Sequence, residues 1–182
     1  MPLTKLKSIS QNTWLGNGKG PEARIGLCYY MCNFVESADE IWNKPDSFDN
    51  AISSAQNFSS ATKMINYAKA QLTRKAPQIP VYPVVVGALE NNRIYRGGLW
   101  FGLITNVIGD PNHEFIIITG SNDDVAYFEP NFGFYQVSNP GMNNREAVEH
   151  FINEQYGPGS HTGNFQYNNV RSIKQSSPLG FN

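Results

Sequence analysis

Apolar residues in the first part of the chain recur with the period of helices. Over residues 28–42 they fall three or four positions apart, which predicts a helix with one buried stripe. Cys32 lies on that stripe, so we expect it in the core. The same spacing predicts two more helices, residues 48–58 and 60–72.

Beyond the turn-rich residues 76–80 the pattern changes to short apolar runs. Five runs are rich in β-branched and aromatic residues and are separated by Gly, Asn, Asp and Pro, which is typical of strands. The predicted strands are residues 81–88, 98–107, 115–119, 125–129 and 132–137. Residues 120–124 are a polar connection of the kind that joins hairpin strands, so we expect Thr119 to pair with Val125.

A helix and a polar tail follow the last of these strands. Asn143 and Glu146 match a capping box at the start of a helix over residues 145–156, and a Gly-Pro pair ends it. The tail contains one weaker strand pattern, residues 164–170. Helices followed by an antiparallel sheet predict the α+β class.

The same patterns divide the chain into three parts. Residues 1–23 are expected to be an N-terminal arm, residues 24–156 one domain, and residues 157–182 a C-terminal tail. One hypothesis is that the Gly- and Pro-containing residues 1–22 form a mobile arm over a cleft.

Composition excludes several classes of function. The chain has 14 basic and 15 acidic residues scattered along its length, so it lacks the clustered positive charge that binds nucleic acid. No apolar stretch has the length of a membrane span, and the N-terminus lacks the apolar core of a secretory signal. Two cysteines four residues apart form no disulfide framework, which is typical of a reducing compartment. They also lack the spacing of zinc ligands, so we predict no metal or other cofactor.

Cys28 is the first candidate for chemistry. Gly26 is expected to turn a loop into a helix whose first residue is Cys28. The unpaired amides and the positive dipole end of a helix N-terminus favour a thiolate, which is the form that attacks a carbonyl carbon. Cys28 is therefore a candidate nucleophile.

His113 and Glu129 are candidates for the base and for the acid that orients it. His113 opens the strand that contains Phe115, and the hairpin register places Glu129 across from Phe115. His113 and Glu129 then project from one face as diagonal neighbours, roughly 7–8 Å apart at the backbone, a gap that a glutamate bridges. Together with Cys28 they form a Cys-His-acid triad. His150 is a rival base, but it lies on the late helix and is expected to face solvent.

Residues 127–135, Tyr-Phe-Glu-Pro-Asn-Phe-Gly-Phe-Tyr, resemble a stretch of a known family. The YopT-like (YopT/AvrPphB) cysteine proteases, bacterial effectors with a papain-like fold, have an aromatic-aromatic-Asp-Pro-Asn-aromatic-Gly motif there. Gly26-Leu27-Cys28 is similar to their nucleophile context, and His113 to their histidine. The resemblance covers roughly residues 24–156 and implies Cys28, His113 and Glu129 as the catalytic residues, with Glu129 in the place of the family's aspartate.

The papain-like resemblance also implies an oxyanion hole and a substrate cleft. Papain-like enzymes use a side-chain amide before the cysteine to stabilise the developing negative charge. Gln11, Asn12 and Asn17 are the candidates here. Trp100 is a candidate cleft wall, with core packing as the alternative, and Asn131 is a candidate to contact the imidazole.

Three functions follow from these residues. The first is a papain-like cysteine protease, for which the resemblance implies a bacterial effector or toxin. Such a protein is secreted through a dedicated system without a cleaved signal peptide and acts in the host cytoplasm on a host protein or on its own precursor. The second is the same triad used for glutamine deamidation, transamidation or acyl transfer. The third is a non-catalytic papain-like binding module.

Overall fold

The computed structural model describes residues 3–9, 21–37, 42, 47–76, 87–99, 113–138, 141–156 and 165–172. Its elements in chain order are β1 (Leu3–Ser8), α2 (Pro21–Ser37), α3 (Phe48–Gln56), α4 (Ala61–Thr73), β2 (Arg93–Leu99), β3 (His113–Thr119), β4 (Val125–Glu129), β5 (Gly133–Val137), α5 (Asn144–Tyr156) and β6 (Phe165–Ser172). Helices combined with an antiparallel sheet confirm the predicted α+β class.

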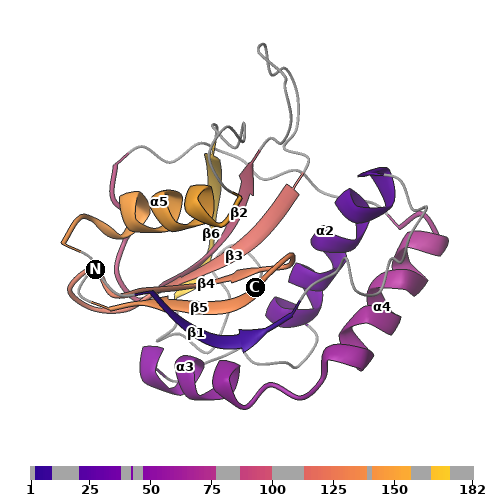
Figure 1. Cartoon of the computed structure of the whole chain (residues 1–182), viewed down its shortest axis with the longest axis horizontal. Coiled ribbons are helices and arrows are strands. Elements are labelled where there is room, and N and C mark those ends of the chain that lie inside the picture. Colours follow the sequence, from indigo (N-terminus) through magenta and orange to yellow (C-terminus); the bar gives the residue numbers. More distant parts are fainter. Residues whose placement is uncertain are drawn as a thin grey trace, which may run out of the picture.

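The strands form one sheet in the order β1-β5-β4-β3-β2-β6, and every neighbouring pair is antiparallel (Figure 1). The β3, β4 and β5 strands match the predicted strands to within two residues. Thr119 pairs with Val125, which confirms the predicted hairpin register. This register brings the start of β3 and the end of β4 to the same end of the hairpin.

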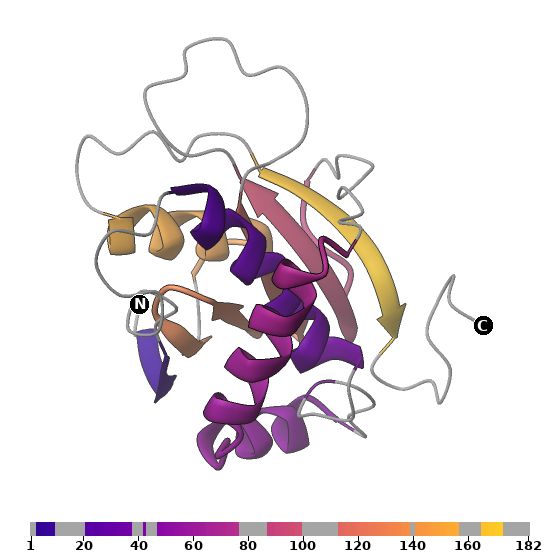
Figure 2. The same ribbon diagram turned by 90° about the vertical axis from the view of Figure 1, so that its right-hand side faces the viewer.

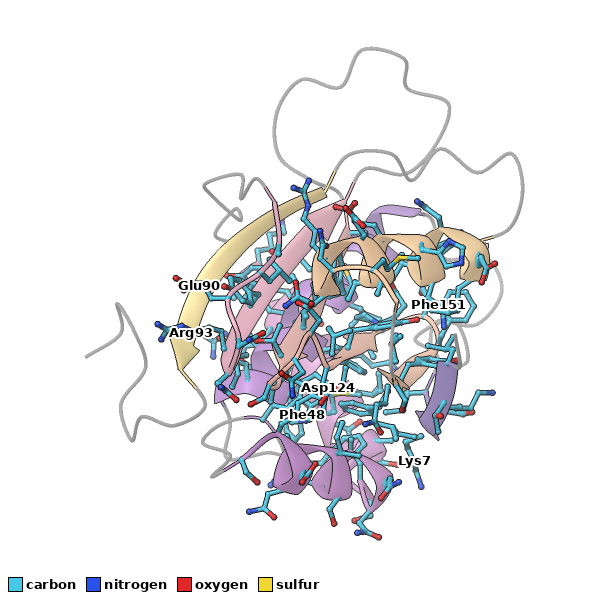
Figure 3. All side chains as sticks on the ribbon, turned by 90° about the vertical axis from the view of Figure 1, so that its left-hand side faces the viewer. Lys7, Phe48, Glu90, Arg93, Asp124 and Phe151 are labelled. Carbon is cyan, nitrogen blue, oxygen red and sulfur yellow. The ribbon has the colours of Figure 1, made fainter. Side chains whose placement is uncertain are left out.

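Helices cover both faces of the sheet. The α2, α3 and α4 helices pack on one face, and α5 packs on the other (Figures 1 and 3). Successive β3 residues face opposite cores, with Ile116 on the α2 side and Ile117 on the α5 side. A strand that is buried on both faces has no polar side, so β3 and β4 appear in the sequence as continuous apolar runs.

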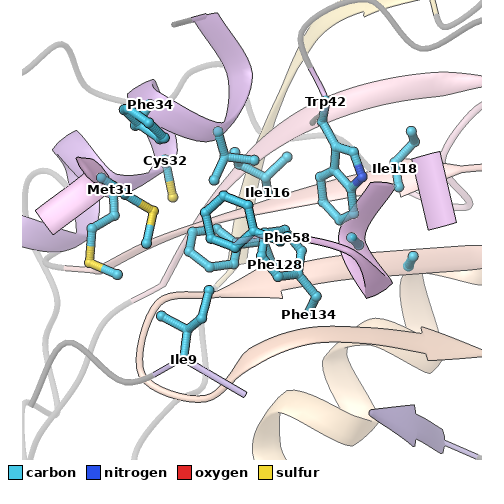
Figure 4. Packing of buried hydrophobic residues seen from close by; sticks show 14 of the residues in the cluster. Ile9, Met31, Cys32, Phe34, Trp42, Phe58, Ile116, Ile118, Phe128 and Phe134 are labelled. Carbon is cyan, nitrogen blue, oxygen red and sulfur yellow. The ribbon is translucent and has the colours of Figure 1, made fainter. Parts of the chain in front are cut away.

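The core on the α2 side is rich in aromatic rings. The Phe58 and Phe134 rings meet at 65°, and those of Phe128 and Phe134 stack at 4.5 Å between their centroids (Figure 4). Trp42, beyond the end of α2, donates from its indole nitrogen to Ala51 O at 3.1 Å. Figure 2 shows α2 and α4 side by side in front of this face, with β6 along one edge.

The predicted helices are confirmed with two differences, which concern the two ends of α2. The helix ends at Ser37, short of the predicted end at Trp42, where the chain forms a turn. Asn143 Oδ1 accepts from Glu146 N at 2.9 Å, so the capping box forms at the start of α5. The α2 helix, however, begins at Pro21 and not at Cys28. Proline suits the first position of a helix, because its fixed φ is helical and it lacks only an N–H that would have no helical partner. The single Gly26 costs only about 1 kcal/mol relative to alanine in a helix interior, so it does not interrupt α2.

The prediction of a strand over residues 98–107 is wrong at its start. The β2 strand is Arg93–Leu99, and residues 100–107 lie outside the described ones. Of the strand predicted over residues 81–88, only Gly87 and Ala88 are described, and they form a bend. Two arginines and two glycines concealed β2 in the sequence, because none of these residues favours strands by propensity.

Both edge strands come from the parts of the chain that we expected to be an arm and a tail. The β1 strand pairs with β5, with Leu3 opposite Val137, so residues 3–8 belong to the sheet and the mobile-arm hypothesis is wrong for them. The β6 strand pairs with β2 and confirms the strand predicted over residues 164–170. Within the described ranges, no helix is long and apolar enough to cross a membrane.

Candidate functional site

The β3–β4 hairpin brings the histidine and the glutamate together. His113 is the first residue of β3 and Glu129 the last residue of β4. His113 Nε2 lies 2.6 Å from Glu129 Oε1, and the two side chains are 2 % and 0 % exposed. A contact this short between buried groups fixes which ring nitrogen faces the carboxylate.

The Glu129 carboxylate also receives a backbone donor. Asn131 N donates to Glu129 Oε1 at 3.1 Å across the turn that follows β4. Glu129 Oε2 is buried and has no hydrogen-bond partner within the described part of the chain. One oxygen therefore carries the described hydrogen bonds that orient this side chain.

Cys28 approaches the same site from α2. Its Sγ accepts a hydrogen bond from Glu114 N at 3.4 Å, and it shares another with the His113 side chain. The residue is 1 % exposed. Because α2 begins at Pro21, Cys28 lies two turns into the helix, and its own N–H belongs to the helical hydrogen bonds. The prediction that a helix N-terminus stabilises the thiolate form of Cys28 is therefore wrong.

His113 is electrostatically distinct from an ordinary histidine. Burial disfavours its charged form, but the charges of Glu129 and Cys28, together with hydrogen bonds to both, raise the pKa of His113 to about 10. The imidazole is therefore protonated at neutral pH and places a positive charge beside the Cys28 sulfur.

A buried ionic cluster lies beside Cys28 and joins α2 to the sheet. Arg96 of β2 donates from Nε to Glu114 Oε2 at 3.0 Å and from Nη1 to Asn33 Oδ1 at 2.8 Å. Its Nη2 donates to Tyr29 O at 3.3 Å, and Glu36 lies 3.7 Å from Nη1. Burial raises the pKa of Glu114, and the charge of Arg96 opposes that rise. Since Glu114 N contacts Cys28 Sγ, Arg96 fixes the strand residue that meets the thiol.

Cys32 lies in the core, as predicted. It is fully buried among the apolar residues under α2 (Figure 4). Burial raises the pKa of its thiol well above the usual value, while the charge of Arg96 partly opposes this rise. Cys32 is therefore kept as a neutral thiol.

Tyr156 and Asn131 complete the described site. The Tyr156 hydroxyl lies 3.3 Å from His113 Nε2 and accepts a hydrogen bond from Asn131 Nδ2 at 2.9 Å. The structure thus brings Asn131 beside the triad residues, and it adds Tyr156 and Arg96, which the sequence analysis did not identify. A tyrosine at the end of an amphipathic helix carries no sequence signal of this contact, because the contact depends on how α5 crosses the sheet.

The remaining candidates lie outside the site or outside the described residues. His150 forms a surface pair with Glu154, with Nε2 at 3.4 Å from Oε1. The proposed oxyanion and cleft residues Gln11, Asn12, Asn17 and Trp100 lie outside the described residues. Among the described residues, no group of three or more His, Cys, Asp or Glu side chains is arranged to hold a metal ion.

Comparisons with models of protein families, with curated proteins and with solved structures found no match.

Proposed function

We propose that this chain is a cysteine hydrolase of papain-like fold, with Cys28 as nucleophile, His113 as acid and base, and Glu129 as the group that orients His113. The main support is the buried contact of 2.6 Å between His113 Nε2 and Glu129 Oε1, made by a histidine that also hydrogen-bonds Cys28. Residues from α2, β3 and β4 meet so that the carboxylate contacts the imidazole and the imidazole contacts the thiol, which is the arrangement that activates a thiol nucleophile.

The hydrogen-bond pattern suggests how a proton would move. Because Nε2 faces Glu129, Nδ1 is the ring nitrogen that exchanges a proton with Cys28 Sγ. A protonated His113 favours the thiolate, which attacks the substrate carbonyl carbon and forms a tetrahedral intermediate. Nδ1–H then protonates the leaving amine, and the thioester remains on Cys28. His113 Nδ1 next takes a proton from water as the water oxygen attacks the thioester carbonyl carbon. The C–S bond then breaks, which releases the acid product and restores the Cys28 thiolate beside the protonated imidazole.

The resemblance to the YopT-like proteases extends this proposal to biology. On that basis the substrate is a protein, either a host protein or the chain's own precursor. The protein would be a bacterial effector or toxin, secreted without a cleaved signal peptide and active in the host cytoplasm.

The first test is the rate at which limiting iodoacetamide alkylates the native protein between about pH 5 and 9, followed by intact mass. We expect one rapid modification at Cys28 below pH 7. His113→Gln and Glu129→Gln should slow it by about tenfold or more, since each removes a hydrogen bond to a charged group. Cys32→Ala is the matched control and should label like the native protein.

The proposal would be contradicted if the alkylation rate of Cys28 in the native protein depended on pH as it does for an ordinary thiol, and if His113→Gln and Glu129→Gln left this dependence unchanged. Circular dichroism and thermal unfolding must show that each variant is folded, because His113 and Glu129 are buried.

The acceptor of the acyl group is tested separately by mass. Incubation with a peptide library gives fragments if water attacks after peptide cleavage. A gain of about one dalton on glutamine would indicate deamidation, and a larger gain would indicate transamidation or acyl transfer. Each product should disappear with Cys28→Ala.

The second candidate is a non-catalytic papain-like binding module. The observation that favours it is the position of Cys28, which is 1 % exposed and lies in a helix interior. For this candidate we expect slow alkylation of Cys28 and an unchanged biological effect in Cys28→Ala.

A further inference from the structure

Tyr156 lies at the centre of the contacts around the histidine and glutamate. It is the last residue of α5, and its hydroxyl lies 3.3 Å from His113 Nε2. Its ring meets the imidazole edge to face, with planes at 82°. His113 and Glu129 are buried, whereas Tyr156 is half-buried, so its side chain is the part of this group closest to solvent.

The direction of each hydrogen bond follows from the donors. An amide nitrogen can only donate, so Asn131 Nδ2–H donates to the Tyr156 hydroxyl oxygen at 2.9 Å. One proton occupies the short contact between His113 Nε2 and Glu129, so the Tyr156 proton cannot use Nε2 as its acceptor. Within the described part of the chain, the remaining acceptor is the Glu129 carboxylate, whose negative charge acts on the Tyr156 hydroxyl.

The hydroxyl retains its proton over the working pH range. Burial, followed by the negative charge of Glu129, raises the pKa of Tyr156 well above its usual value. The ring is held as well, because Phe132 packs edge to face on Tyr156 with centroids 5.1 Å apart. Tyr156 is thus a fixed donor to the carboxylate.

We infer that Tyr156 and Asn131 act together as positioning residues for His113. Asn131 makes two of the contacts around the His113–Glu129 pair. Its backbone N–H donates to Glu129 Oε1, and its side-chain Nδ2 donates to Tyr156 OH. Together they hold the carboxylate against Nε2, which directs Nδ1 toward Cys28. This inference rests on the proposed function for its catalytic consequence, but not for the geometry of the pair.

The test compares Tyr156→Phe, Asn131→Ala and the double variant with the native protein. Tyr156→Phe keeps the ring and removes only the hydroxyl. The control is Tyr127→Phe, because the Tyr127 hydroxyl also ties the sheet to α5, donating to Gln155 Oε1 at 3.0 Å. The two readouts are the alkylation rate of Cys28 and the exchange of the His113 Nε2 proton with water, followed by NMR.

We expect Tyr156→Phe and Asn131→Ala each to slow alkylation about fivefold, the value of one net hydrogen bond. The double variant should be no slower than either single variant, because both remove the same connected contact. Exchange of the Nε2 proton should accelerate in all three. Tyr127→Phe should leave both readouts within about twofold of native.

Two results would overturn the inference. One is unchanged exchange of the Nε2 proton in Tyr156→Phe, and the other is an equal effect of Tyr127→Phe, which would indicate a general loosening of α5. Slow alkylation in the native protein would instead overturn the proposed function, and the exchange comparison would still decide the role of Tyr156.

Discussion

The length of the Glu129 side chain determines how it meets His113. From the last residue of β4 its Oε1 reaches Nε2 at 2.6 Å, and the backbone of both residues is fixed by strand pairing, His113 with β2 and Glu129 with β5. An aspartate is shorter by one carbon–carbon bond, about 1.5 Å, so the same backbone would leave its carboxylate out of hydrogen-bond range. The glutamate therefore suits this backbone better than an aspartate would.

We therefore expect Glu129→Asp to slow the alkylation of Cys28 at pH 6.5 by about tenfold, as an interrupted charged hydrogen bond would. Glu149→Asp is the control, because Glu149 lies on α5, where it pairs with Arg145 at 2.9 Å. A Glu129→Asp variant that reacts as fast as the native protein would show that side-chain length does not set this contact.

The raised pKa of His113 also predicts how stability changes with pH. Its folded-state pKa of about 10 lies above the usual value of 6.5, so the folded state binds the proton more tightly than the unfolded state. The stabilisation is complete below about pH 6.5, declines as pH rises, and is lost above about pH 10. Urea unfolding of native protein and His113→Gln should show a difference in unfolding free energy that shrinks over this range. If the unfolding free energies of the two proteins changed with pH in parallel, the raised pKa of His113 would be contradicted.

At the scale of elements, Arg96 joins three of them. It lies on β2, pairs with Glu114 of β3, and binds Asn33 and Tyr29 O of α2. Removing the cation leaves two buried carboxylates, Glu114 and Glu36, without their partner. Breaking a buried pair from one side costs more than the pair contributes, since it leaves buried charge uncompensated.

Arg96→Met should accordingly lower the free energy of unfolding by about 3–5 kcal/mol in urea. The matched control is Arg145→Met, which removes a half-buried i,i+4 pair with Glu149 on one helix and should cost only about 1 kcal/mol. Adding Glu114→Gln to Arg96→Met should recover part of the loss. Equal losses for Arg96→Met and Arg145→Met would mean that the cluster does not hold α2 to the sheet.

Gly133 is the residue that lets β1 approach β5. Its φ is +126°, and a Cβ there would meet the Lys7 carbonyl oxygen and lie 2.8 Å from Ile9 N. Gly133→Ala should destabilise the protein by about 3 kcal/mol, from backbone strain and overpacking together. Gly141→Ala, at φ +68° with no atom within 4 Å of the added Cβ, should cost only about 1 kcal/mol. Thermal unfolding measures the stability of both variants. Similar midpoints for Gly133→Ala and Gly141→Ala would show that β1 shifts to accommodate the added methyl group.

The sequence predicted elements that depend on local patterns and missed those that depend on neighbours. The β3–β4 hairpin was predictable because two apolar runs flank one polar turn, and this placed His113 near Glu129. The β2 strand was not, because Gly97 is there to make room for the Phe115 ring and Arg96 to bind a helix. Tyr156 was missed for a similar reason, since its partners lie on other elements.

At the scale of the whole molecule, the sheet is completed by strands from both ends of the chain. The β1 strand covers the edge of β5, and its Leu6 contributes to the core on the α2 side together with Ile9 just beyond it. The side chains of Lys5 and Lys7 are exposed on this strand, and charged side chains on an edge strand discourage pairing with another molecule. Figure 3 shows Lys7 at this border of the molecule.

Deletion of residues 1–9 should therefore lower the thermal midpoint and expose β5 as a new edge. We expect concentration-dependent self-association in light scattering, because an uncovered strand pairs readily with another chain. At temperatures well below the lowered midpoint, Cys28 should be alkylated at the native rate, since β1 lies beside β5 and not beside β3. Faster alkylation with an unchanged midpoint would indicate the opposite arrangement, in which these residues cover the thiol without stabilising the sheet.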